Sequence, residues 1–185
     1  MNKNKITEAI LNASEPKPKV LGIDLDADAL SMANKRFKSY KKNVTLVQGN
    51  FARLDEIAET NGFSNADGIL FDLGLSSLQL EEDYRGFSLI RTGKLDMRFD
   101  VGQELTAHEL VNNESAEELG NIIFQFGEEP SARRIARAIV NNRPIHNTTD
   151  LAEVVARSIG RSRRRNIHPA TRTFQALRIA VNGEI

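Results

Sequence analysis

The first 73 residues alternate short apolar runs with amphipathic stretches, and this alternation restricts the chain to few folds. Apolar runs at 20–25 (VLGIDL) and 44–47 predict strands, and apolar residues within 27–40 recur at helical spacing. A short helix is expected from Arg53, and a third strand over 67–73. Strand, helix, strand, helix, strand is typical of a parallel α/β sheet.

The signals after residue 100 are helical. We therefore expect an all-helical block joined to the α/β unit. Near the N-terminus, Thr7 is expected to cap a short helix, TEAILNA. The later helices are expected after the capping-box pattern of Ser115 and Glu118, over 130–142, over 149–159, and after Pro169, which suits a first helical turn.

Length and composition exclude several classes of protein. With 185 residues the chain is one domain, or one domain with an insertion. It contains no cysteine, which excludes disulfides, thiolate metal sites and a cysteine nucleophile, and this fits a cytoplasmic protein. The sequence contains no run of about 18 apolar residues, so no membrane span is predicted. No metal site is predicted, because the histidines have no metal-ligand spacing: His108, His146 and His168.

The net charge of zero hides a polarised chain. Residues 131–180 contain eleven arginines and two acidic residues, a local charge of +9, whereas residues 51–130 are strongly acidic. Guanidinium groups form bidentate contacts with phosphate and stack on bases, so this window favours a nucleic-acid partner. The alternatives are a solvated helix face, or arginines paired with the acidic half of the same fold.

Four side chains stand where a nucleotide-like cofactor would bind a parallel sheet. Asp24 ends the first strand, where a carboxylate can accept both ribose hydroxyls of an adenosine group. Phe51 follows the second strand and offers a ring to an adenine. Asp72 ends the third predicted strand, and Gln79 lies on the polar loop beyond it. Carboxyl ends of successive strands meet at one edge, so one nucleoside could touch all of them.

Long motifs in the chain closely resemble the bacterial small-subunit ribosomal RNA cytosine-N4 methyltransferase family, also called RsmH or MraW. The resemblance covers nearly the whole sequence. Leu25 and Leu78 stand where that family usually has Arg and Pro. The matching segments are GIDLD at 22–26, QGNF at 48–51, DGILFDLGLSSLQL at 67–80, RGFS at 85–88, LDMRFD at 95–100, FGEEPSARRIARAI at 126–139 and HPATRTFQALRIAVN at 168–182.

The resemblance implies a function and a set of roles. It implies S-adenosylmethionine as methyl donor and a cytidine of 16S rRNA near the decoding centre of the small ribosomal subunit as acceptor. Asp24, Phe51, Asp72 and Gln79 would contact the cofactor. The turn after Asp72 is hypothesised to orient the cytosine amine, with Ser76 and Ser77 nearby. The expected RNA contacts are Arg161, Arg163, Arg164, Arg165, His168 and Arg172, although His168 could instead simply begin the last helix.

The implied fold is a partial Rossmann-like class I methyltransferase sheet with an inserted all-helical domain. We expect residues 1–100 to form the cofactor-binding unit and 101–168 the helical RNA domain. Residues 169–185 are then expected to be a helix that returns to the methyltransferase core. The oligomeric state is left open, a homodimer included.

The two ends of the chain depart from the family pattern. The family's first strand and its Gly-Gly-His-Thr loop are replaced by NKIT, and the family's last strands do not follow Ile185. Losing a central strand would cost several buried side chains at roughly 1.5–3 kcal/mol each. We therefore expect a fragment or a degraded copy. The alternatives are a non-catalytic RNA-binding remnant and a nicotinamide-dependent oxidoreductase, against which the absence of Gly-x-Gly-x-x-Gly counts.

Overall fold

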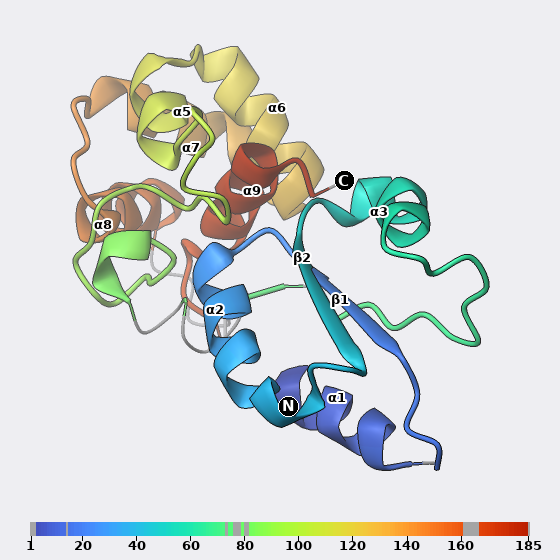
Figure 1. Cartoon of the computed structure of the whole chain (residues 1–185). Helices are drawn as coiled ribbons and strands as arrows, with labels where there is room; N and C mark the ends of the chain where they lie inside the picture. Colours follow the sequence, from blue (N-terminus) through green and yellow to red (C-terminus); the bar gives the residue numbers. More distant parts are fainter. Residues whose placement is uncertain are drawn as a thin grey trace. The chain divides into compact units, whose positions relative to one another are not determined.

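The structure is a computed structural model that describes residues 3–13, 15–72, 74–75, 79, 82–160 and 167–184. It divides the chain into two compact units, Met1–Gly74 and Leu75–Ile185 (Figure 1). Among the described residues, no helix has both the length and the apolar character needed to cross a bilayer.

Unit 1 is built on two parallel strands. The strands β1 and β2 pair in register from Val20 opposite Val44 to Asp24 opposite Gln48, and helix α2 packs against both. This confirms the two expected strands and the helix between them. In chain order the elements are α1 (Lys3–Asn12), β1 (Val20–Asp24), α2 (Ala27–Arg36), η1 (Lys38–Tyr40), β2 (Val44–Gln48), η2 (Phe51–Arg53) and α3 (Leu54–Thr60).

Two helix boundaries in unit 1 differ from the sequence prediction. Helix α1 begins at Lys3, so Thr7 lies within the helix and is not its cap. Lys, Ile, Glu, Ala and Leu are acceptable to good helix formers, and they carry the helix across Thr7. The single helix expected over 27–40 is divided at Phe37, which leaves helical geometry at the end of α2.

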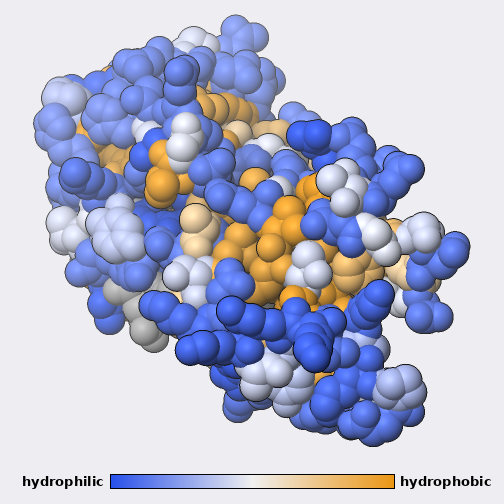
Figure 2. Space-filling view, in the orientation of Figure 1, coloured by the Kyte–Doolittle hydropathy of each residue, from blue (hydrophilic) through white to orange (hydrophobic). Residues whose placement is uncertain are grey.

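The third strand expected over 67–73 is wrong for the residues that the structure describes there. Residues 68–72 form no strand, and Ile69, Leu70 and Phe71 are 54–63% exposed. A strand needs a neighbouring backbone to satisfy its N–H and C=O groups, and among the described residues β1 pairs only with β2. The sheet itself is half-buried, and Figure 2 shows a hydrophobic area over its strands.

Unit 2 is helical and contains the larger core. Helix α6 packs against α7 and α9, α7 packs against α8, and α5 contacts both α7 and α9. The expected helices after residue 100 are confirmed, including the Ser115 cap of α6. The elements are η3 (Asp83–Arg85), α5 (Ala107–Asn113), α6 (Ala116–Gly127), α7 (Ala132–Asn141), α8 (Thr148–Ile159) and α9 (Thr171–Asn182).

The boundary between the two compact units falls at Gly74. Phe87, Leu95 and Met97 belong to the same hydrophobic core as the helices, because each is at most 5% exposed and packs among their buried side chains. Helix α9 also packs within this unit, on α5 and α6. The assignment of separate functions to residues 1–100, 101–168 and 169–185 stays a prediction.

Gly86 of the RGFS motif has a backbone that only glycine fits. Its φ is +73°, and a Cβ there would lie 2.1 Å from the carbonyl oxygen of Lys94 and 2.8 Å from the amide nitrogen of Asp96. The η3 turn and the loop after Lys94 can therefore lie this close together because residue 86 has no side chain. Gly183 at the end of α9 has a comparable φ of +56° but nothing within 4 Å of its Cβ position.

We expect Gly86→Ala to lower the free energy of unfolding much more than Gly183→Ala does. The left-handed backbone alone costs about 1–2 kcal/mol with a side chain, and Gly183→Ala should show only that. Gly86→Ala adds a clash with backbone atoms. Chemical denaturation of both variants measures the difference, and equal losses would contradict the close approach at Gly86.

Candidate cofactor site and nucleic-acid surface

Asp24 stands at the carboxyl end of β1, held by the turn that follows. The amide of Gly49, just beyond β2, donates to the Asp24 carbonyl (3.0 Å), and the amide of Asp26 donates to Asp24 Oδ1 (3.0 Å). The side chain is half-buried. The two strand ends and the Asp24 carboxylate are therefore fixed relative to one another by backbone bonds.

Asp26 performs a role that the sequence analysis did not assign. Its side chain is 2% exposed and caps α2, because Oδ1 accepts from the amides of Asp28 (2.9 Å) and Ala29 (3.5 Å). Free amides in the first turn of a helix require such an acceptor. The Asp-x-Asp pattern between the strand and the helix is the sequence feature from which this helix cap could have been predicted. Capping by Asp26 sets where α2 begins, directly after the candidate site.

Phe51 lies just beyond β2 and contacts the residue before Asp72. Phe51 opens η2 two residues after Gly49, with Asn50 Oδ1 accepting from the Ala52 amide (2.9 Å). The Phe51 ring is 39% exposed and meets the ring of Phe71 edge-on, with centroids 5.9 Å apart. Asp72 follows Phe71 directly and is exposed. Asp24 and Phe51 thus stand at the carboxyl ends of the paired strands β1 and β2, and a cofactor site shared with Asp72 stays a prediction.

The other expected cofactor, catalytic and RNA-binding residues belong to unit 2 or lie outside the described residues. Gln79 is 6% exposed and belongs to unit 2. Ser76 and Ser77 lie outside the described residues, and so do four expected RNA contacts: Arg161, Arg163, Arg164 and Arg165. The roles of all of them stay predictions.

His168 and Arg172 are described, and both have partners within unit 2. His168 Nδ1 accepts from the Ala170 amide (3.2 Å), which supports its role at the start of α9. Arg172 Nη1 donates to the carbonyl of Glu128 (2.8 Å), the residue that ends α6. With Ile167 and Pro169 the two side chains line a surface cavity of about 170 Å³. Their contacts stabilise the fold and leave an RNA role untested.

Several arginines of the basic window satisfy carbonyls at the ends of neighbouring helices. Besides Arg172 on α6, Arg143 donates to the Val111 carbonyl near the end of α5 (2.7 Å), and Arg134 donates to the Ile159 carbonyl at the end of α8 (3.2 Å). The last carbonyls of a helix lack partners within the helix and carry partial negative charge. These three side chains therefore bond to backbone carbonyls within the fold, which is not the pairing with acidic residues that the sequence analysis gave as an alternative.

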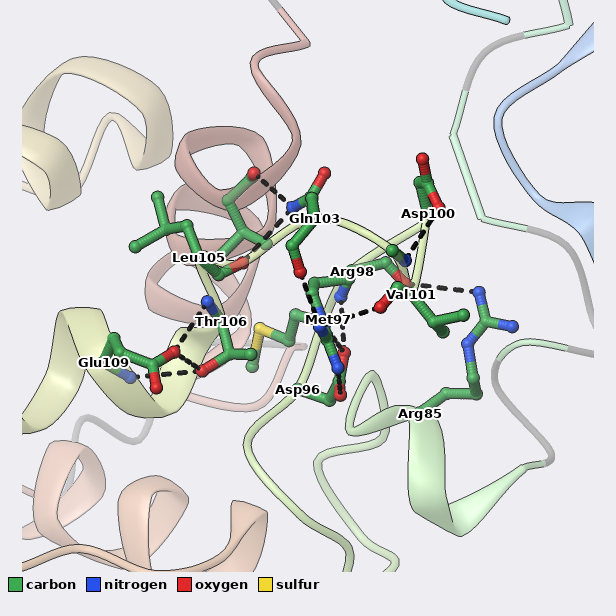
Figure 3. Close-up of polar contacts among 12 residues, drawn as sticks. Arg85, Asp96, Met97, Arg98, Asp100, Val101, Gln103, Leu105, Thr106 and Glu109 are labelled. Carbon is green, nitrogen blue, oxygen red and sulfur yellow. Dashed lines mark hydrogen bonds and ion pairs between the residues drawn. The ribbon is translucent and has the colours of Figure 1, made fainter. Parts of the chain in front are cut away.

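The LDMR motif forms a polar network in unit 2 (Figure 3). Arg98 binds both carboxylate oxygens of Asp96, with Nε–Oδ1 2.9 Å and Nη2–Oδ2 2.8 Å, and also donates to the carbonyls of Val101 and Gln103. Arg85 Nη2 donates to the carbonyls of Arg98 and Phe99. In the part of the chain that the structure describes, the motif thus has a clear structural function.

The ion pair sets the charge state of Asp96. Burial alone would raise the pKa of Asp96, but hydrogen bonds from the Arg98 side chain and backbone, aided by the charges of Arg98 and Arg85, hold that pKa below its ordinary value. The side chains of Asp96 and Arg98 are each only 20% exposed. The contribution of the ionised carboxylate to stability is therefore present above the ordinary carboxyl pKa and is lost as pH falls through the lowered one.

We expect Asp96→Asn to reduce the free energy of unfolding by about 2–3 kcal/mol at neutral pH, because hydrogen bonds to a charged group are lost. The difference from the parent chain should shrink as pH falls below about 4, the ordinary pKa of an aspartate, and through the lowered pKa of Asp96 in the folded chain. Denaturant melts between pH 7 and pH 3 measure this, with Glu117→Gln on the exposed face of α6 as the control. A difference that does not change with pH would contradict the lowered pKa.

Comparison with known proteins identifies the family. The model of the MraW methylase family matches residues 4–185. A ribosomal RNA small subunit methyltransferase H of Dehalococcoides mccartyi is 50% identical over 179 residues, which is 97% of this chain and 51% of that protein. Proteins of the same name from Thermomicrobium roseum and Syntrophobacter fumaroxidans are 51% and 45% identical, each over 97% of this chain and 56% and 57% of their own lengths.

The chain belongs to the MraW methylase family. It spans about half the length of the curated relatives it matches. The resemblance found in the sequence motifs is thereby confirmed.

Proposed function

We propose that the chain binds S-adenosylmethionine at the carboxyl ends of β1 and β2, and that it serves methylation of the exocyclic N4 amine of a cytidine in 16S rRNA. The observation that carries this proposal is that Asp24 and Phe51 follow the carboxyl ends of the paired strands β1 and β2, with Phe51 in contact with Phe71, the residue before Asp72. The family and the names of the relatives support the reaction class and the small-subunit rRNA substrate. Such a substrate places the activity in the cytoplasm, on the small ribosomal subunit.

The residues present fit the adenosyl part of the cofactor. A carboxylate at the end of a parallel strand can accept hydrogen bonds from both ribose hydroxyls, and Asp24 is anchored there by the amides of Gly49 and Asp26. Phe51 offers a partly exposed ring as a stacking surface for adenine. When bound, S-adenosylmethionine supplies an electrophilic methyl group on a sulfonium.

The acceptor amine defines what the remaining residues must do. The lone pair of a cytosine amine is delocalised into the ring, so the amine needs close alignment and a proton acceptor. We assign alignment to the turn that follows Asp72, with Ser76 and Ser77. The base must also leave its stack, at a cost of a few kcal/mol, and the RNA must be held meanwhile. We assign that holding to the RNA contacts expected from the sequence, which are Arg161, Arg163, Arg164, Arg165, His168 and Arg172.

One observation favours a second candidate function, RNA binding without methyl transfer. Ile69, Leu70 and Phe71 directly precede Asp72, are largely exposed and are paired with no strand among the described residues. Asp72 is then held less firmly than Asp24. A chain of this kind could retain an RNA surface in unit 2 while binding the cofactor weakly.

We expect Asp24→Asn to weaken S-adenosylmethionine binding by roughly ten- to a hundredfold, the worth of hydrogen bonds to a charged group. Asn retains an acceptor for the Asp26 amide, so the turn is preserved. Phe51→Leu should weaken binding less. Calorimetry of the full chain measures both, and Asp55→Asn, an exposed carboxylate on α3, is the control.

Transfer of a labelled methyl group to a small-subunit rRNA transcript, followed by nucleoside digestion, tests the reaction itself. N4-methylcytidine in the digest supports the proposal. RNA binding without any S-adenosylmethionine binding would favour the second candidate. Binding of a nicotinamide dinucleotide in place of S-adenosylmethionine would contradict both.

A further inference from the structure

The described arginines of the basic window 131–180 fall into groups by their partners. Arg134, Arg143 and Arg172 donate to carbonyls at helix ends. Arg157 pairs with Glu153 and Arg178 with Glu184, so carboxylates neutralise these two. Two others on α7 remain, Arg133 and Arg137. Counting only the described residues, Arg133 makes no side-chain hydrogen bond or ion pair, and Arg137 donates only to the Arg133 carbonyl of its own helix.

Helix α7 separates its residues sharply into two faces. Ala132, Ile135, Ala136 and Ile139 are buried against the rest of unit 2. The exposed side carries Arg133, Arg134 and Arg137, and the sequence of the helix, ARRIARAIVN, contains no acidic residue. We call these three side chains the α7 arginine face.

The α7 arginine face is unfavourable for the helix that carries it. Arg133 and Arg134 lie in the first turn, near the positive end of the helix dipole, where a cation costs about 0.3–1 kcal/mol. Glu129 before the helix accepts from the Ser131 amide, but the first turn itself has no acidic residue. Arg134 recovers part of this cost by donating to Ile159. Arg133 gains no comparable bond, and a local rule broken without compensation is typical of a functional position.

The face adjoins the point where the chain leaves α8. Arg134 Nη2 lies 3.2 Å from the carbonyl oxygen of Ile159, and Gly160 then leads into the segment containing Arg161–Arg165, which lies outside the described residues. The C-terminal end of α8 thus lies beside the α7 arginine face.

We infer that the α7 arginine face binds the phosphodiester backbone of RNA, with Arg133 and Arg137 each contacting a phosphate. This inference rests on the proposed function, since the RNA is the methylation substrate. Residues i and i+4 of a helix are neighbours on its surface, so the two guanidinium groups can serve successive phosphates of one strand. Guanidinium binds phosphate through paired N–H donors. Contacts of this kind position the RNA and do not read its sequence.

The double variant Arg133→Gln/Arg137→Gln of the full chain tests the inference. The control is Arg53→Gln/Arg157→Gln, which removes the same charge from two exposed arginines that are paired with glutamates on α3 and α8. Binding of a fluorescent small-subunit rRNA transcript, and of an unrelated RNA of equal length, is measured at several salt concentrations. Thermal melts of both variants confirm that they fold.

The α7 double variant should bind both RNAs about tenfold or more weakly at low salt. The slope of log affinity against log salt is negative. Each lost phosphate contact should reduce the magnitude of this slope by about 0.7–0.9, so the loss of two contacts should reduce it by about 1.5. The control should change little, and Arg133→Lys/Arg137→Lys should retain most of the slope, because an ammonium also binds phosphate as a point charge.

An unchanged salt slope in a folded α7 double variant would overturn the inference. An equal loss in the control would do the same, since the effect would then be one of net charge. The inference would also be overturned if the α7 double variant bound RNA as well as the parent chain does but no longer bound an acidic protein. The α7 arginine face would then be a protein-binding surface. If the parent chain binds S-adenosylmethionine but no RNA, the RNA part of the proposed function fails as well. If the parent chain binds RNA but not S-adenosylmethionine, the cofactor part of the proposed function fails. The comparison of RNA binding between the α7 double variant and its control still decides the inference in that case.

Discussion

The parallel pairing of β1 with β2 is the constraint on which the candidate cofactor site depends. Asp24 and Gln48 are partners in the ladder, so both strands end at the same level. The chain then makes two polar turns, one capped by Asp26 and the other by Asn50, and these turns follow the carboxyl ends of the neighbouring strands β1 and β2. A slip of one residue would move each side chain to the opposite face of the sheet. The backbone register thus fixes the geometry of the site.

The sequence predicted the elements of unit 1 well where local signals suffice. The strands ending at Asp24 and Gln48 and the helix between them follow from apolar periodicity. The apolar run at 69–71 has the same local signal, yet it forms no strand, because a strand also requires a backbone partner distant in sequence. The apolar pattern of the sequence indicates which residues favour an extended backbone. It does not show whether a neighbouring strand is present to form the hydrogen bonds that stabilise this conformation.

Charge in unit 2 shows the same difference between local and tertiary information. Counting arginines predicted a polyanion partner, but the count cannot separate a guanidinium that closes a helix end from one that faces solvent. Arg143 and Arg172 are engaged with the ends of α5 and α6, and no sequence pattern revealed those distant carbonyls. The RGFS and LDMR motifs were likewise read as part of a ligand loop. In the structure Gly86 and the Asp96–Arg98 pair hold the loop to the helical core.

The bonded arginines and the α7 arginine face are two uses of one chemical property. A guanidinium keeps its charge when it donates to carbonyls, because a carbonyl is a dipole and not a counter-ion. Arg134 and Arg172 therefore stabilise helix ends and still add positive potential to unit 2, whereas Glu153 and Glu184 cancel the charges of the arginines they bind. Stability and phosphate attraction do not compete at Arg134 and Arg172. At Arg133 and Arg137 the charge makes no bond to another element within the part of the chain that the structure describes. Substitutions at these two positions can therefore change RNA binding without changing the stability of the fold.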